Sequence, residues 1–162
     1  MSAFEQRKCF TLLELLSVIG IIAIVAGIIL GGMSYAGRRA DQAKTISLMT
    51  QLEMALDAFK QDRGYYPPMA SAVTVEFLTV SNKLTLQLGG ASGQYEFVHS
   101  STQRPYLELG WVTNTAQPYI DAWGNAFQYS CPGTNNTASY DLWSEGASSS
   151  ADDDICNWKR RQ

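Results

Sequence analysis

The residues best suited to acid–base chemistry lie near the C-terminus. Asp152, Asp153 and Asp154 form an acidic run, and the only histidine, His99, lies far upstream of it. Asp152 and Asp154 could act as a general acid and base, which leaves a membrane-anchored enzyme as one hypothesis. His99 has no carboxylate–nucleophile arrangement beside it in sequence, so a hydrogen-bonded or exposed histidine is the better interpretation. The sequence therefore favours a structural or binding role over catalysis.

The three cysteines divide between the two ends of the chain. Cys9 precedes a long apolar run, whereas Cys131 and Cys156 lie in the polar C-terminal part. If the start of the chain is removed, an even pair remains, and an even pair in an exported domain favours a disulfide. A Cys131–Cys156 bridge would add about 3 kcal/mol of stability by closing a loop. Two unpaired buried thiols are the alternative.

A continuous apolar segment follows two basic residues near the N-terminus. No charged residue occurs from Leu15 to Leu30, and the stretch from Phe10 to Gly32 is long enough for a helix to cross a hydrocarbon core of about 30 Å. Arg7 and Lys8 lie just before it and favour a cytoplasmic location for that end. We therefore expect a single-pass membrane protein whose C-terminal head faces outward.

One carboxylate breaks the apolar character of this segment. Glu14 lies four residues after Phe10, where an unpaired carboxylate would cost about 2.5 kcal/mol or more. Such a charge indicates a function, unless its side chain reaches back to the membrane surface. A cation from a neighbouring copy would stabilise it.

The N-terminal residues resemble the cleavage signature of the type IV pilin-like family. From Arg7 to Glu14 the sequence reads Arg-Lys-Cys-Phe-Thr-Leu-Leu-Glu, directly before the apolar segment. The resemblance implies that prepilin peptidase cuts between Cys9 and Phe10 and that the new amine of Phe10 is methylated. It also implies that Glu14 pairs with the N-terminal amine of a neighbouring subunit during assembly. The sequence departs from the family at Cys9, where glycine is usual.

The segment beyond Gly32 changes from continuously apolar to amphipathic. Apolar residues recur there at spacings of three or four, which places them on one helical face: Ile46, Met49, Leu52, Leu56 and Phe59. Gly64 suits a helix C-terminal cap, and Pro67 and Pro68 cannot continue the helix. We expect one helix from Phe10 to about Arg63, and its first half has no partner within the chain.

The remaining segments predict an α+β fold, in which the second half of the long N-terminal helix packs against a small antiparallel β-sheet head. Strands are expected at Tyr106–Val112, Ala126–Cys131 and Ser139–Ser144, where aromatic and branched residues gather. A short helix is expected around Val75–Leu84. The expected division is a leader at 1–9, a membrane-spanning assembly half at 10–32, an amphipathic half at 33–63, a variable connector at 64–104 and the head at 105–162.

Three C-terminal segments, Asp121–Tyr129, Tyr140–Ala147 and Asp152–Trp158, are similar to the major pseudopilin family of type II secretion systems. The resemblance implies a calcium ion in the last loop, which orders that loop for assembly. A short acidic loop supplies the hard oxygen ligands that calcium prefers. The implied ligands are Glu145, Ser148, Ser150, Asp152 and Asp154. Ser148 stands where the family has aspartate and the loop is shortened, so a solvated acidic turn is the alternative.

Both resemblances imply a homo-oligomer in a helical filament, anchored in the inner membrane with its head in the periplasm. The implied partners are prepilin peptidase, the inner-membrane assembly platform and minor pseudopilins. A true type IV pilin, or a minor pilin with an adhesive or binding role, is the alternative function. Net charge is −3 and the longest basic run is the short Lys159–Arg161 tail, so no nucleic-acid partner is expected.

The four tryptophans admit two interpretations. They could form a platform for a ligand, although aromatic side chains of a small head more often fill its core. These residues are Trp111, Trp123, Trp143 and Trp158.

Overall fold

The computed structural model describes residues 11–148 and 150–159, without the side chains of residues 30–34 and 92. The predicted leader 1–9 and Phe10 lie outside this part of the chain. The contacts divide the chain into two compact units, residues 1–40 and 41–162. The elements are α1 (Leu12–Arg63), β1 (Met69–Val80), β2 (Lys83–Leu88), η1 (Ala91–Gly93), β3 (Gln94–Glu96), β4 (Gln117–Pro118), β5 (Gln128–Cys131), β6 (Asp141–Ser144) and β7 (Ile155–Cys156).

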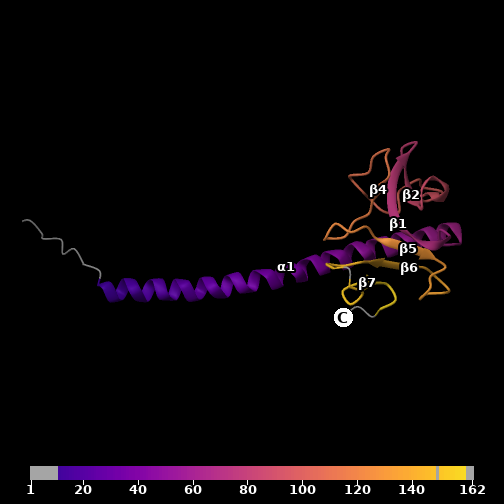
Figure 1. Ribbon diagram of the computed structural model, residues 1–162. Helices are drawn as coiled ribbons and strands as arrows, with labels where there is room; N and C mark the ends of the chain where they lie inside the picture. Colours follow the sequence, from indigo (N-terminus) through magenta and orange to yellow (C-terminus); the bar gives the residue numbers. More distant parts are fainter. Residues whose placement is uncertain (1–10, 149, 160–162) are drawn as a thin grey trace, which may run out of the picture. The chain divides into compact units, whose positions relative to one another are not determined.

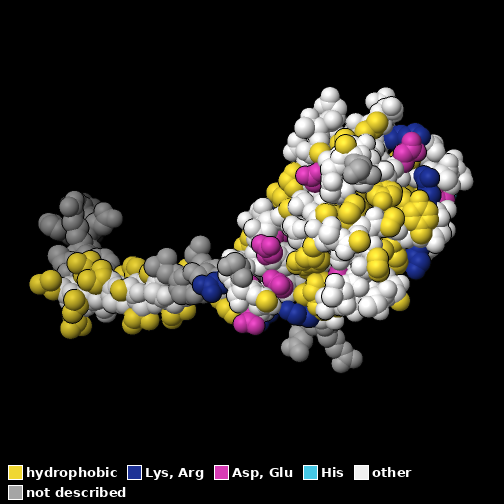
Figure 2. All heavy atoms as spheres, turned by 45° about the vertical axis from the view of Figure 1, so that its right-hand side comes forward, with side chains coloured by type: hydrophobic (Ala, Val, Ile, Leu, Met, Phe, Trp, Pro, Cys, Tyr) yellow, Lys and Arg dark blue, Asp and Glu magenta, His cyan; other side chains and the backbone are white. Residues whose placement is uncertain are grey.

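The first half of α1 is apolar on every side. The window Leu12–Ile29 has a mean hydropathy of 2.7 with none of it buried, and by length and composition it qualifies as a membrane span. Its large apolar side chains are 47–89% exposed, and Figure 2 shows them along the visible face of this segment. A helix that is hydrophobic all round needs an apolar environment on all sides. The predicted helix is confirmed over the described residues.

The second half of α1 carries the predicted apolar stripe into the core. Met49, Leu52, Leu56 and Phe59 are all buried, and they pack against residues of the sheet. The helix ends where predicted, because Gly64 adopts a left-handed φ of +85° and its N–H donates to the Lys60 carbonyl at 2.7 Å. This is the backbone conformation of a glycine cap.

Within the described residues, the strands form a seven-stranded antiparallel sheet beside the second half of α1 (Figure 1). The strand order is β3-β2-β1-β5-β6-β7, with β4 also paired to β1. The long strand β1 joins two parts of the sheet, because its first half pairs with β5 and its second half with β2 and β4. The α+β class and the strands predicted at 126–131 and 139–144 are confirmed by this arrangement.

The short helix predicted around Val75–Leu84 is wrong. This segment forms the β1–β2 hairpin, in which Val75 pairs with Leu88 and Val80 with Lys83. Its turn consists of Ser81 and Asn82, with left-handed φ values of 51° and 63°. Two left-handed residues in succession fit the twist of a two-residue hairpin turn, and the branched residues before them favour a strand.

The strand predicted at Tyr106–Val112 is also wrong. The segment forms turns and irregular loop instead. Leu107 is buried in the core, while the Tyr106 hydroxyl donates to the carboxylate of Asp62 near the end of α1. Aromatic and apolar residues here anchor a loop to the helix and the core, which explains why they resemble a strand in sequence.

We predict that Leu52→Ala lowers the free energy of unfolding of the head by about 3 kcal/mol, because it leaves a cavity at a fully buried position. Met54→Ala is the matched control, since Met54 lies two residues away on α1 and is 60% exposed. Its effect should stay below about 0.5 kcal/mol. Urea denaturation of the detergent-solubilised chain, followed by tryptophan fluorescence, measures both, and equal losses would contradict the assigned core face.

Candidate functional site

Glu14 lies in the exposed first turn of α1. Its backbone N–H donates to both the carbonyl and the side-chain hydroxyl of Thr11, at 3.1 and 3.2 Å, so Thr11 acts as the helix cap. The Glu14 carboxylate makes no hydrogen bond or ion pair with any described residue. The side chain is therefore available to a cation from outside this part of the chain.

The loop between β6 and β7 closes tightly on itself. Gly146 has a φ of +71°, and a Cβ there would lie 2.5 Å from the Asp153 carbonyl oxygen, so this position requires glycine. The Asp153 carboxylate accepts hydrogen bonds from the Ser148 backbone N–H at 2.8 Å and hydroxyl at 3.1 Å. Lys159 donates from Nζ to the Ala151 carbonyl at 2.9 Å. These bonds bring the two sides of the loop together.

The predicted calcium ligands lie in this loop with different surroundings. Glu145, Ser148, Ser150 and Asp152 are exposed, and Asp154 is half-buried beside Trp143 and Trp158. The structure joins Ser148 to Asp153, a residue absent from the predicted ligand set. No group of three or more histidine, cysteine, aspartate or glutamate side chains in the described residues is arranged to hold a metal. A site built largely from carbonyl oxygens would not need such a group, so calcium binding stays a prediction.

The predicted Cys131–Cys156 disulfide is not formed, and both residues are free cysteines. Cys131 pairs with Met69 of β1, while Cys156 pairs with Trp143 of β6. Strand β6 lies between β5 and β7, which carry the two cysteines. Two strand spacings amount to about 10 Å, beyond the Cα separation of about 7 Å that a disulfide can span. The alternative of two unpaired thiols is the observed state.

Asp121 organises the loop that precedes β5. Its carboxylate is almost fully buried and accepts hydrogen bonds from the backbone N–H groups of Trp123 and Asn125, each at 2.8 Å, and from the Ser144 hydroxyl at 2.6 Å. The Asn125 side chain donates to the Gly146 carbonyl at 2.7 Å. Asp121 therefore serves as a structural acceptor that joins this loop to β6 and the C-terminal loop.

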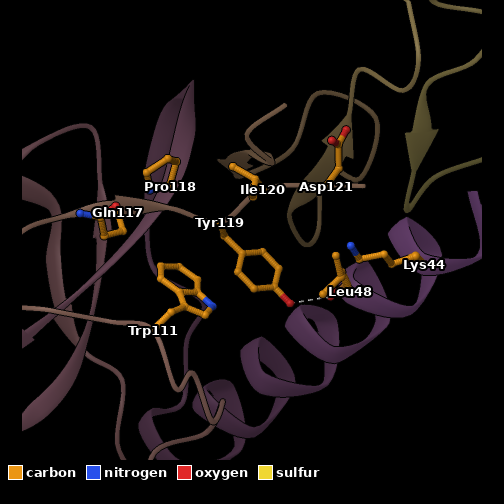
Figure 3. Close-up of a pocket in the computed structure, with 8 residues that line it drawn as sticks. All are labelled: Lys44, Leu48, Trp111, Gln117, Pro118, Tyr119, Ile120 and Asp121. Atoms are coloured by element: carbon orange, nitrogen blue, oxygen red, sulfur yellow. Dashed lines mark hydrogen bonds between the residues drawn. The ribbon is translucent and has the colours of Figure 1, made fainter. Parts of the chain in front are cut away.

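A hollow of about 390 Å³ lies between this loop and the start of the head's part of α1 (Figure 3). The Tyr119 ring is buried in its wall and donates from its hydroxyl to the Leu48 carbonyl at 3.3 Å, and burial raises the pKa of Tyr119 to about 12. The lining residues are Lys44, Leu48, Trp111, Gln117, Pro118, Tyr119, Ile120 and Asp121. Sequence reasoning missed this hollow, because its walls come from segments far apart in the chain.

His99 has the structural role expected of it. Its Nδ1 accepts hydrogen bonds from the backbone N–H groups of Ser101 and Thr102, at 3.2 and 3.4 Å. Beside it, Asp62 accepts hydrogen bonds from Ser100 and Tyr106, which hold the pKa of the Asp62 carboxyl well below its usual range. These groups tie the loop after β3 to the end of α1.

The tryptophans fill the core only in part. Trp123 is partly buried and packs against it, whereas Trp111 is 45% exposed in the hollow. Trp143 and Trp158 are half-buried and pack edge to face with ring centroids 5.8 Å apart. Neither a buried cluster nor a single platform describes all four.

Comparison with known proteins decides the family. The profile described as type II secretion system (T2SS), protein G matches residues 33–158, which include the second half of α1 and the sheet. The chain belongs to the type II secretion system protein G family. A core protein G of Aeromonas hydrophila is 32% identical over 156 residues, covering 95% of this chain and 94% of the relative. The core protein G of Escherichia coli K12 is 29% identical over 164 residues, covering 98% of this chain and 95% of the relative.

A crystal structure of the major pseudopilin from the type 2 secretion system of enterohaemorrhagic Escherichia coli is also similar, at 22% identity and a TM-score of 0.43. The match covers 78% of this chain and 92% of that one. Family membership confirms the resemblance and the function predicted from the sequence, a subunit of type II secretion, and it favours a structural role over catalysis. The apolar half of α1 agrees with membrane anchoring.

We predict that Asp153→Ala opens the C-terminal loop, because it removes both hydrogen bonds to Ser148. Amide hydrogen exchange at Ser148 should become about tenfold faster. Asp152→Ala is the matched control, since the neighbouring Asp152 side chain is exposed. Both variants are measured by hydrogen–deuterium exchange mass spectrometry with a chelator present, so that metal binding cannot contribute. Unchanged exchange in Asp153→Ala would show that this pair does not close the loop.

Proposed function

We propose that this chain is the major pseudopilin of a type II secretion system, stored in the inner membrane through the first half of α1 and polymerised through it into a helical filament. Prepilin peptidase would cut between Cys9 and Phe10 before assembly, and the head would lie in the periplasm. The observation that carries the proposal is a helix that is apolar on all sides over Leu12–Ile29, joined to a head of the protein G family.

Storage and polymerisation follow from one property of this helix. Its large apolar side chains are 47–89% exposed, so water is an unfavourable environment for all its faces. Lipid covers them while the subunit is stored in the membrane, and in a filament the same segments of other copies cover the faces that point toward them. The transfer exchanges one apolar environment for another, which keeps its net free energy small enough for an assembly platform to drive. The platform and the minor pseudopilins are partners proposed on family grounds.

Glu14 would fix the position of each subunit relative to its neighbour in the filament. Its carboxylate contacts no cation among the described residues and lies in an apolar segment, where an unpaired charge is unfavourable. Cleavage before Phe10 would create an amine four residues away in sequence. In a filament, the amine of a neighbouring copy can meet this carboxylate, and removing one partner of such a buried pair leaves an uncompensated charge.

We predict that Glu14→Ala and Glu14→Gln abolish efficient filament formation without blocking processing. The yield of sheared filaments should fall about tenfold or more, since loss of a buried ion-pair partner costs about 3 kcal/mol. Ser17→Ala is the matched control, because Ser17 lies one turn further on and its hydroxyl donates only to the Glu14 carbonyl, at 2.9 Å.

The measurement is immunodetection of sheared filaments together with N-terminal sequencing of each variant. Every chain should begin with methylated Phe10, which separates an assembly defect from a processing defect. Normal filaments from Glu14→Ala would refute the pairing. A mature chain that still begins at Met1 would refute the processing step.

We further propose that calcium orders the C-terminal loop through Glu145, Ser148, Ser150, Asp152 and Asp154. Two features support it. The loop offers hard oxygen donors, the class that calcium prefers, and the positive φ of Gly146 lets the loop turn back closely on Asp153. Bound calcium would hold the two sides of the loop together alongside the Ser148–Asp153 contact, and that added order would favour contacts between heads.

We predict that EGTA lowers the melting temperature of the detergent-solubilised chain by about 5 °C, because a ligand that binds only the folded state stabilises it. Added calcium should restore the transition and magnesium should not, since magnesium requires smaller octahedral sites. Asp152→Asn should remove the response to EGTA, and Glu108→Gln, at an exposed residue outside the loop, should keep it. An identical transition with and without EGTA would contradict a calcium ion that stabilises the head.

A further inference from the structure

In a filament, packing among the apolar halves of α1 would leave some of their apolar side chains exposed to water. Large apolar side chains are exposed on all its faces from Leu12 to Ile29. When helices gather around a common axis, each covers only the faces of its neighbours that point inward or sideways. The outward faces would remain in water unless another part of the subunit covers them. This need for cover arises in the proposed filament and rests on that function.

The head offers an apolar hollow of suitable chemistry. At the rim, Trp111 and Ile120 are 45% and 47% exposed, and Pro118 and Leu48 contribute further carbon surface. Lys44 lies at the helix side, where its aliphatic stem can line apolar surface while its ammonium reaches water. Exposed apolar residues that gather in one concave place mark a binding surface more often than scattered ones do.

Two of the polar groups around the hollow, the Tyr119 hydroxyl and the Asp121 carboxylate, are satisfied from within. The Tyr119 hydroxyl donates to the Leu48 carbonyl, and the Asp121 carboxylate accepts from two backbone N–H groups and Ser144. An occupant therefore need not supply hydrogen bonds to avoid leaving these groups unpaired. An apolar helix, whose own backbone groups are bonded internally, meets that requirement.

We infer that this hollow receives apolar side chains from the first half of α1 of a second copy of the chain. Among the described residues, Leu12–Ile29 is the longest run of exposed apolar side chains, so it provides the occupant with matching chemistry. The hollow belongs to the unit 41–162 and the occupant to the unit 1–40 of another copy. Two different surfaces thus meet, and such a heterologous contact extends into a helical polymer where its rotation does not close.

The first test replaces the rim. Trp111→Ser and Ile120→Ser should each lower the yield of sheared filaments about tenfold, as expected when an apolar anchor worth about 1.4 kcal/mol or more is removed. Val80→Ser is the matched control, because Val80 is 44% exposed at the β1–β2 turn, outside the hollow, and should leave the yield unchanged. Melting temperatures of all three variants should equal that of the unaltered chain, which excludes misfolding.

The second test identifies the occupant. A benzophenone amino acid at position 120 of the full chain is photo-activated in filaments, and the linked peptide is mapped by mass spectrometry. Mixed copies with light and heavy isotopes show whether the link joins two subunits. Links from position 120 to residues 12–29 of another copy are expected. Links only to lipid, to a different protein or to another head segment would overturn the inference, as would normal filament yield from both rim variants.

The two proposals fail differently. If the unaltered chain never forms filaments, the proposed function fails and the docking contact fails with it. If the unaltered chain forms filaments while position 120 links elsewhere, only the docking contact is refuted.

Discussion

The structure depends on one constraint: the first half of α1 has no polar face. Over Leu12–Ile29, water is unfavourable to every side of the helix, because its large apolar side chains are exposed. The segment therefore needs an apolar environment, which lipid would supply before assembly and the proposed filament after it. The soluble head serves that constraint, because it keeps a polar, folded unit attached to a helix that would otherwise aggregate in water.

The second half of the same helix shows how one element meets two environments. From Arg38 onward, charged and polar residues interrupt the apolar run and leave a single apolar stripe for the sheet. Phe59 lies at the centre of an aromatic group. Its ring is stacked on that of Phe97, with the ring centroids 5.8 Å apart, and is edge-on to that of Tyr106, with the centroids 5.9 Å apart. Asp62 then ties the helix end to the loop after β3 through Ser100 and Tyr106. Apolar packing and a satisfied carboxylate thus act on the same turn of helix.

Sequence patterns predict the features that depend on neighbouring residues, but they do not predict which strands lie side by side. The helix and its end at Gly64 follow from periodicity and backbone preference, both local properties. The β1–β2 hairpin is hard to recognise in the sequence because its turn, Ser81-Asn82, lacks the usual glycine. The cysteine count favoured a bridge, yet spacing along the chain contains no information that β6 lies between β5 and β7. The hollow likewise exists only once segments far apart in the chain meet.

The C-terminal loop and the wall of the hollow are connected by hydrogen bonds. Asn125 donates to the Gly146 carbonyl and its N–H donates to Asp121, whose carboxylate also accepts from Ser144. Asp121 directly follows Ile120 at the rim. Order in the loop after β6 therefore favours one position of the rim residue. A ligand that orders the loop would stabilise the same wall that an apolar helix is inferred to contact, so loop order and subunit packing would reinforce each other.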